Sequence, residues 1–501
     1  MMADEDRRVN DPTPHLQESA ATPHRALRLG RRALLVLVSL TPLWICLSSG
    51  AMTSSLWMDE ISYFQYESDP ALRASELGRP GSAVTPLLST FAYCEFQRLF
   101  RRGIGLLPGV TRSGPEIPLR ALPMTSFLLL VILTWIAGFR SRRSEVQATL
   151  GALVVSSTPI LLHYAFEARP YAFSACLAAA YVASVGPALR RGGRWTVLAV
   201  GRGFILQRVN WWAVCIPLAL ALWGVWDAIR RRSLSPRQLR LAAIVAPGGI
   251  LAVAEWQYLV WTTPPNPPPT FPLFVPHGLW IGLLSTVQRI FSPFSGLEGV
   301  WSAVFGVSGS LAILLGLVFL SARKRQDPIE VPIAVVGLLS LVLSVILGGH
   351  FGTIVFGRHQ VAMVAVLVFG TTLVSGRIAN LFRVIVVSLL FAFLPATVEG
   401  INDRGNGKMI ARILNSRRST DIDPALVVQQ SLRLGYPDPL NSIGADFYLN
   451  SGAPPASPYP IYELPDHRSV TNQRGVFRYF NGGRSWWRTS PNLSSRNGWN
   501  C

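Results

Sequence analysis

The sequence has little charge and almost no lysine. Only 15% of its 501 residues are Asp, Glu, Lys or Arg, whereas soluble domains carry about 25%. Half of the residues are hydrophobic, which excludes a disordered chain and disfavours an ordinary soluble enzyme. Lys324 and Lys408 are the only lysines, so arginine supplies nearly all of the 46 basic residues and the net charge of +19. Five cysteines, an odd number, indicate no disulfide framework.

The sequence also lacks metal-ligand spacings, nucleotide-binding glycine loops and nucleophile elbows in a convincing context. Long apolar runs are present instead, and a membrane-spanning helix needs about 20 such residues. The candidate spans are 33–53, 119–139, 146–166, 171–189, 195–209, 211–229, 241–261, 300–322, 331–349, 360–376 and 384–398. We therefore predict an all-α polytopic membrane protein with about eleven transmembrane helices.

The run 195–209 is the weakest of these spans, because it is short and contains Arg202, Gln207 and Arg208. Polar side chains inside a membrane usually face a cavity or another helix. Three interpretations stay open: a half-span, a helix that lines a polar cavity, or a span placed wrongly.

The arginines gather in alternate loops, at 140–143, 190–194, 230–240, 323–325 and 377–383. Basic loops stay on the cytoplasmic side of a membrane. We therefore predict a multi-pass protein of the plasma (inner) membrane with a cytoplasmic N-terminus and an extracytoplasmic C-terminus. Residues 1–32 are interpreted as a disordered cytoplasmic tail, 33–398 as the transmembrane domain and 399–501 as an extracytoplasmic C-terminal domain.

Two external segments have patterns of their own. The first external loop, 54–118, contains Val84, Leu87, Leu88 and Phe91 at helical spacing, which predicts an amphipathic helix on the membrane surface. In 399–501, short alternating runs favour a small mixed α/β domain.

Two adjacent carboxylates, Asp59 and Glu60, follow the first span. Carboxylates at a membrane interface are costly to desolvate. One interpretation is a solvated loop with Trp57 in the aromatic belt of the membrane. The other is a general base or a cation-binding carboxylate beside a membrane-embedded substrate.

A second candidate site lies between the third and fourth spans, in the stretch from His163 to Tyr171. Pro170 suits the first turn of a helix, whose amino end attracts anions. With the planar donors of Arg169, this position suits a phosphate; the alternative is a weak loop ion pair between Arg169 and Glu167. His163, on an apolar face, is interpreted as a packed histidine.

Arg358 at the start of the tenth span is a further phosphate-binding candidate, with an interfacial snorkelling arginine as the alternative. A divalent cation held by the carboxylates is also left open.

Three stretches together resemble one family. They are Leu56-Trp57-Met58-Asp59-Glu60, Pro115-Glu116-Ile117-Pro118-Leu119-Arg120 and Tyr164-Ala165-Phe166-Glu167-Ala168-Arg169-Pro170-Tyr171-Ala172. In this order and on one side of the membrane, they resemble the bacterial branch of the protein O-mannosyltransferase-like family, glycosyltransferase family 39. The resemblance covers roughly residues 30 to 400 and implies the GT-C fold.

The resemblance implies an enzyme that moves a hexose or pentose from a polyprenyl-monophosphate donor to an extracytoplasmic glycan, lipid or protein. Asp59 would be the general base, Glu60 would hold the acceptor or orient Asp59, and Glu167 would be the second carboxylate of the site. Arg169 would bind the donor phosphate, as would Arg120, Arg358 and Tyr171 in looser roles. Relatives of this kind generally work without a metal or other cofactor, and no nucleic-acid partner is expected.

The chain departs from the family pattern at Val84-Thr85-Pro86-Leu87, where many relatives carry a His-Pro-Pro element. Two alternatives therefore stay open. One is a transporter or flippase of a lipid-linked saccharide, which Arg202 and Glu255 would favour. The other is a catalytically degenerate scaffold for envelope enzymes.

Overall fold

Every secondary-structure element in the described part of the chain is a helix. The computed structural model describes residues 15–54, 87–104, 116–142, 144–232, 235–262, Gly316, 333–350, 357–374 and 377–402. The helices are α1 (His15–Ser39), α2 (Thr41–Ser48), α5 (Leu87–Ile104), α6 (Glu116–Arg142), α7 (Glu145–Ser157), α8 (Pro159–Ala165), α9 (Pro170–Arg191), α10 (Arg194–Val209), η2 (Trp211–Val214), α11 (Cys215–Arg231), α12 (Pro236–Thr262), α15 (Ile333–His350), α16 (Gly357–Thr372), α17 (Arg377–Ala392) and α18 (Leu394–Asn402).

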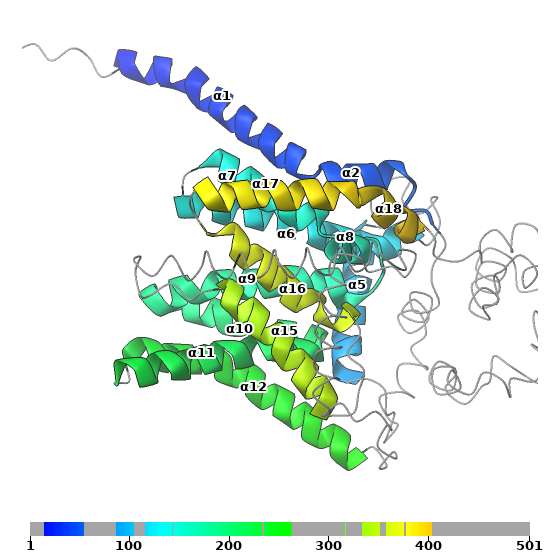
Figure 1. Cartoon of the computed structure of the whole chain (residues 1–501), viewed down its shortest axis with the longest axis vertical. Helices are drawn as coiled ribbons and strands as arrows, with labels where there is room; N and C mark the ends of the chain where they lie inside the picture. The colour runs from blue at the N-terminus through cyan, green and yellow to red at the C-terminus, as the bar shows by residue number, and fades with distance from the viewer. Residues whose placement is uncertain are drawn as a thin grey trace, which may run out of the picture.

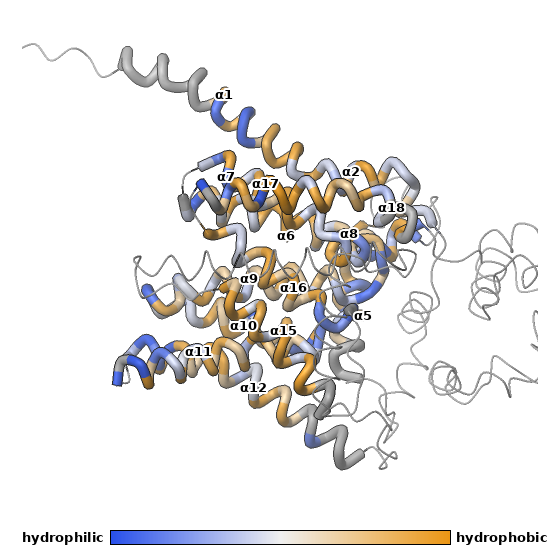
Figure 2. Tube along the Cα trace, in the orientation of Figure 1, coloured by the Kyte–Doolittle hydropathy of each residue, from blue (hydrophilic) through white to orange (hydrophobic). Residues whose placement is uncertain are grey.

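The helices stack in layers with their axes in broadly similar directions (Figure 1). Helices α6, α7 and α17 pack together beside α1, α9 and α16 pack on them, and α10, α11, α12 and α15 complete the opposite side. Helices α8 and α18 lie at one end of this bundle, and α5 packs near the same end against α6 and α10. The middle stretches of the helices are mainly hydrophobic, and polar residues collect near the ends (Figure 2).

Length and hydropathy identify four helices that could cross a membrane: 116–141, 170–191, 211–230 and 236–254. Two helix pairs meet the same criteria together, α1 with α2 and α7 with α8, with bends of 54° and 68°. The described residues therefore contain four to six candidate spans, which supports a membrane protein. The count of about eleven stays a prediction, and of the predicted span 300–322 only Gly316 is described.

The junction of α9 and α10 shows how the sequence sets a helix reversal. Gly192 and Gly193 both have positive φ values, 65° and 52°, a region that side-chain-bearing residues disfavour. Gly192 also leaves room for the guanidinium of Arg240, which donates a hydrogen bond of 3.1 Å to the carbonyl of Leu189. The two glycines thus end α9 and return the chain antiparallel along it.

Helices α15 and α16 approach each other closely through two glycines. A methyl group on Gly337 would overlap the backbone of Leu367, and one on Gly370 would overlap the backbone of Ala334. Close backbone approach through small residues is a common way to pack helices where lipid surrounds them. Only glycine at both positions permits this spacing.

The weakest predicted span forms a continuous helix, α10. Within it, Arg202 donates a hydrogen bond of 3.0 Å to the carbonyl of Ala180 in α9, and Gln207 donates one of 3.1 Å to the carbonyl of Trp211. These polar side chains therefore connect neighbouring elements of the bundle.

Helix boundaries differ from the sequence-based ones at both ends of the bundle. Helix α1 begins at His15, so it includes more than half of the stretch assigned to a disordered tail. Helix α18 continues to Asn402, past the boundary placed at 398, and Asn402 donates a hydrogen bond of 3.1 Å to the hydroxyl of Ser49. The rest of the predicted C-terminal domain lies outside the described residues.

From Leu87 onward, the stretch predicted as an amphipathic helix forms helix α5, while its place on a membrane surface stays a prediction. Its buried face carries Tyr93, Cys94 and Gln97, while Leu99 is exposed. Gln97 donates a hydrogen bond of 2.9 Å to the carbonyl of Leu119. This contact fixes α5 against the first turn of α6.

Candidate functional site

The second candidate site, His163 to Tyr171, begins in α8, which bends away from α7 at one end of the bundle. Thr158 is extended (φ −65°, ψ 114°), and Pro159 then starts α8. The chain turns again after Ala165, where the amide of Arg169 donates to the carbonyl of Glu167 at 2.7 Å. Arg169 is the N-cap of α9 and Pro170 lies in its first turn, which confirms the helix start predicted from the proline.

Glu167 is the centre of a buried charged cluster, which we define as His163, Glu167 and Arg169. Only 2% of Glu167 is exposed. Its Oε1 accepts a hydrogen bond of 3.2 Å from Nη1 of Arg169, and its Oε2 lies 3.3 Å from Nε2 of His163. A carboxylate so deeply buried requires partners of this kind, because its desolvation is otherwise very costly.

The burial distinguishes this arrangement from the loop ion pair weighed as an alternative. The Glu167–Arg169 pair forms, but its side chains are only 3% and 11% exposed, so it is not a solvated surface contact. His163, predicted as a packed histidine, is buried as expected. Its Nε2 lies 3.3 Å from Oε2 of Glu167, so it also belongs to the charged cluster.

One aromatic ring lies against the arginine of the cluster, and two more rings continue from it. The guanidinium of Arg169 lies 4.9 Å from the ring centre of Tyr171, a cation–π distance. The ring of Tyr164 meets that of Tyr171 edge-on at 4.8 Å and that of His163 at 4.9 Å. The three rings thus connect the arginine of the cluster to its histidine.

The start of α16 brings a second arginine toward the cluster. Arg358 and Arg169 both interact electrostatically with Tyr164 and with His359. Helix α16 contacts α8, α9 and η2, and the ring of Trp212 stacks on that of His359 at 5.6 Å. Two guanidinium groups from distant parts of the sequence thus act on the same tyrosine and the same histidine, and guanidinium groups suit an anionic ligand.

Arg120 lies in a different place from these two arginines. It is completely buried, and its Nη1 donates to the carbonyls of Ala51 and Ser54 at 3.0 and 2.9 Å, and to the hydroxyl of Ser54 at 2.9 Å. It therefore holds the chain where α2 leads into the segment predicted as the first external loop. Binding of a donor phosphate by Arg120 stays a prediction.

Asp59 and Glu60 lie outside the described residues, a few positions after Ser54. Of the remaining predicted site residues, Arg169 contacts both Glu167 and Tyr171, and Arg358 interacts electrostatically with Tyr164. Among the residues it describes, no group of three or more His, Cys, Asp or Glu side chains could hold a metal ion. The Asp59-Glu60 pair does not belong to those described residues.

Sequence reasoning did not single out Trp212 or His359 for the site. The residues next to Trp212 and His359 in the sequence do not indicate that either belongs to this site. Each is brought there by the packing of its helix, η2 or α16, against distant parts of the chain. His163 is four residues before Glu167 in the sequence, and the turn after α8 brings the two side chains together.

No protein-family model and no curated protein matches the chain. The family resemblance therefore depends on the three motifs quoted above.

Proposed function

We propose that the protein is a membrane glycosyltransferase that moves a sugar from a polyprenyl-monophosphate donor to an extracytoplasmic acceptor. The observation that supports this most is the buried charged cluster, in which Glu167 lies between His163 and Arg169 while Arg358 interacts electrostatically with the adjacent Tyr164. A site with two guanidinium groups and one carboxylate suits a phosphate that gains charge as its bond to the sugar breaks.

In the proposed reaction, Asp59 accepts the proton of the acceptor hydroxyl. The hydroxyl oxygen then forms a bond to the anomeric carbon, and the bond from that carbon to the phosphate oxygen breaks. The electron pair leaves with the polyprenyl phosphate, whose developing charge is stabilised by Arg169 and Arg358. Glu167 holds the guanidinium of Arg169 in place through its 3.2 Å hydrogen bond.

Helix α6 links the chain that leads to Asp59 with the charged cluster. Its Arg120 donates to the carbonyls of Ala51 and Ser54, a few residues before Asp59 in the sequence. Helix α6 also contacts both α8 and α9. This arrangement is consistent with the proposal that Asp59 and the charged cluster serve one site.

The test measures sugar release from radiolabelled polyprenyl-phosphate hexoses and pentoses in membranes that contain the full chain. We expect turnover with the wild type and a loss of at least about a hundredfold in Asp59→Asn, since one positioned acid–base group supplies about 10²–10⁴ in rate. Glu167→Gln should also lower turnover, because Arg169 loses the carboxylate that holds its guanidinium in place. Asp227→Asn is the matched control, because Asp227 lies in α11 and hydrogen-bonds Gln238 at 3.2 Å, away from the cluster.

Full activity in Asp59→Asn, with normal membrane insertion, would contradict the proposed mechanism. Movement of the labelled lipid across vesicles without a new glycosidic bond would favour the transporter. Arg202, one of the residues that suggested transport, bonds the carbonyl of Ala180 and is accounted for by that contact. Retained cellular function in a double Asp59, Glu167 variant would favour the scaffold.

A further inference from the structure

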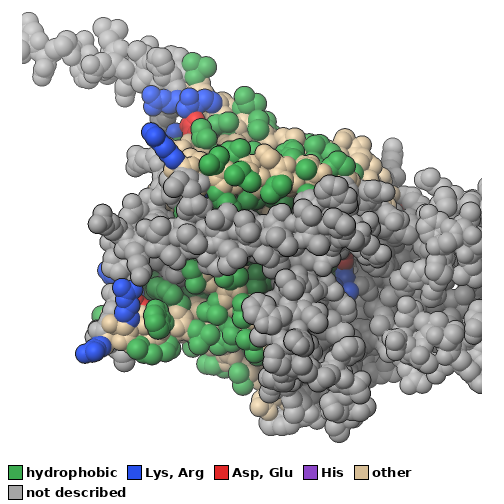
Figure 3. All heavy atoms as spheres, viewed as in Figure 1, with side chains coloured by type: hydrophobic (Ala, Val, Ile, Leu, Met, Phe, Trp, Pro, Cys, Tyr) green, Lys and Arg blue, Asp and Glu red, His purple; other side chains and the backbone are tan. Residues whose placement is uncertain are grey.

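A second group of charged residues lies at the other end of the bundle, where α1 crosses the start of α7. An open pocket of about 1030 Å³ is lined there by Arg28, Arg31, Arg32 and Glu145, with apolar side chains beside them. Basic side chains gather around one acidic side chain in this part of the surface (Figure 3). None of these residues takes part in the proposed sugar transfer.

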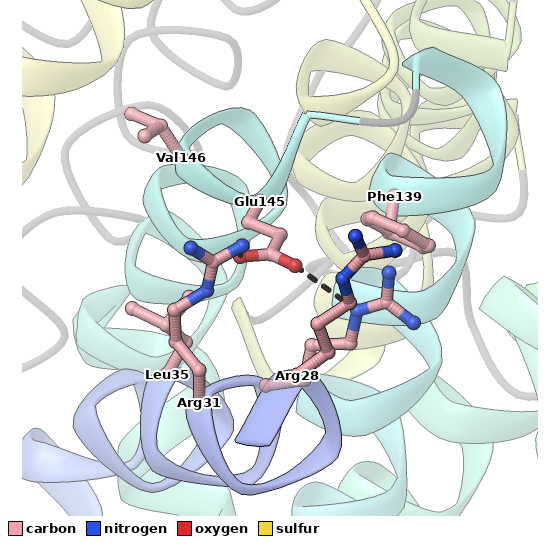
Figure 4. Close-up of a pocket in the computed structure, with 7 residues that line it drawn as sticks. Arg28, Arg31, Leu35, Phe139, Glu145 and Val146 are labelled. Carbon is pink, nitrogen blue, oxygen red and sulfur yellow. Dashed lines mark hydrogen bonds and ion pairs between the residues drawn. The ribbon is translucent and has the colours of Figure 1, made fainter. Parts of the chain in front are cut away.

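One carboxylate sets the positions of two of the arginines. Glu145 lies 2.8 Å from Nη2 of Arg31 and accepts a hydrogen bond of 3.0 Å from Nε of Arg32. The guanidinium of Arg32 also lies 4.4 Å from the ring centre of Phe139. Figure 4 shows Glu145 among the arginine side chains, with Phe139 beside them.

The pocket keeps an excess of positive charge. Three arginines face one carboxylate, and Arg28 forms no ion pair with any residue that the structure describes. Glu145 uses one nitrogen of Arg31 and one of Arg32, whereas a guanidinium has five N–H donors. Donors therefore remain for an anion with several oxygens, for which a phosphate is the best geometric match.

Apolar side chains continue from the basic ones along α1. Leu34 and Val38 follow Arg31 by three and seven residues, so they lie on the same side of the helix, and both are exposed. Val146, at the edge of the pocket, is exposed as well. The order from charge to hydrocarbon along α1 is the order within a phospholipid, from headgroup phosphate to acyl chain.

We propose that the pocket formed by Arg28, Arg31, Arg32 and Glu145 binds the phosphate headgroup of an anionic phospholipid, whose acyl chains lie against Leu34 and Val38. The lipid joins α1 to α6 and α7, and this site is independent of the sugar-transfer site. The shared chemistry is a phosphate ester, and a soluble phosphate ester would lack the apolar contacts.

The test is native mass spectrometry of the full chain, titrated with phosphatidylglycerol or phosphatidylcholine. Each basic residue beside an anionic lipid surface contributes a factor of roughly five in affinity. We therefore expect Arg28→Gln/Arg31→Gln to weaken phosphatidylglycerol binding roughly 25-fold and to leave phosphatidylcholine binding unchanged. This variant keeps Arg32, which packs on Phe139, so that the fold is least disturbed.

The matched control is Arg230→Gln/Arg237→Gln, which also removes two exposed arginines from helix ends but lies outside the pocket. The proposal expects less than a twofold change in the control. Equal weakening in both pairs, or wild-type binding in Arg28→Gln/Arg31→Gln, would overturn it. So would full displacement of the lipid by stoichiometric glycerol phosphate, because the occupant would then be a soluble phosphate ester.

Discussion

The two charged groups at opposite ends of the bundle use the same residue types in different surroundings. At one end, Glu167 and Arg169 are only 3% and 11% exposed; at the other, Glu145 and Arg31 are 14% and 66% exposed. A buried ion pair is sensitive to the loss of either partner, because the remaining charge stays out of water. An exposed pair contributes little, since water replaces the missing partner.

The distance between two charged groups alone therefore does not indicate how much the pair contributes to stability. The two pairs have similar separations, 3.2 and 2.8 Å, yet we expect their removal to differ by several-fold in free energy.

Arg169→Gln should have the largest effect. It leaves the buried Glu167 carboxylate with His163 as its remaining partner in the charged cluster, and such a loss costs about 3–5 kcal/mol. Thermal unfolding in detergent and the sugar-release assay should both show the change. Wild-type melting and wild-type turnover in Arg169→Gln would contradict the expectation that the buried ion pair contributes more than the exposed one.

Arg120→Gln should follow closely. The side chain is completely buried and donates to two carbonyls, at Ala51 and Ser54, and an unsatisfied buried acceptor costs about 1–3 kcal/mol. Arg120→Lys separates charge from geometry, because lysine keeps the charge but not the planar donors. If lysine restored full stability, charge rather than the shape of the guanidinium would be the property that matters here.

Gly337→Ala, in the α15–α16 contact between the two charged groups, should have an intermediate effect on stability. Gly337→Ala introduces a methyl group against the backbone of Leu367, and such overpacking costs about 1–3 kcal/mol. Gly249→Ala in α12 is the matched control, because no atom lies within 4 Å of the added carbon. The melting temperature should fall only in Gly337→Ala; equal shifts in both variants would indicate that the tight α15–α16 contact can relax.

Arg31→Gln should have the smallest effect on stability. Its partner Glu145 is also held by Arg32, and an exposed pair contributes about 0.2–1 kcal/mol. The same thermal measurement should detect little change, and the sugar-release assay none. A loss as large as that of Arg169→Gln would mean that burial does not set the difference between the ends.

The sequence predicted the class of structure because apolar runs and arginine-rich loops are local signals. Pro170 fixed the start of α9, and the spacing of apolar residues predicted the helix seen as α5. The number of membrane spans is harder to predict from the sequence. Several described helices are shorter than the roughly 20 residues that a span needs, and two of the apolar runs are bent into helix pairs.

The roles of individual arginines were harder to predict. Arg120, Arg202, Arg240 and Arg383 each donate to backbone carbonyls of another helix or loop. Arg169 instead pairs with a carboxylate. Nothing in the local sequence separates these two uses, since both depend on which segment the fold brings alongside the guanidinium.

The 68° bend between α7 and α8 determines how far these two helices extend across a bilayer. Helix α7 has 13 residues, so it rises about 20 Å at 1.5 Å per residue, and the steeply inclined α8 adds only about 4 Å. The hydrocarbon layer is about 30 Å thick. Placed in a bilayer as proposed, the turn that follows α8 lies below the outer surface, at a depth that a phosphate carried on a lipid can reach without leaving the membrane.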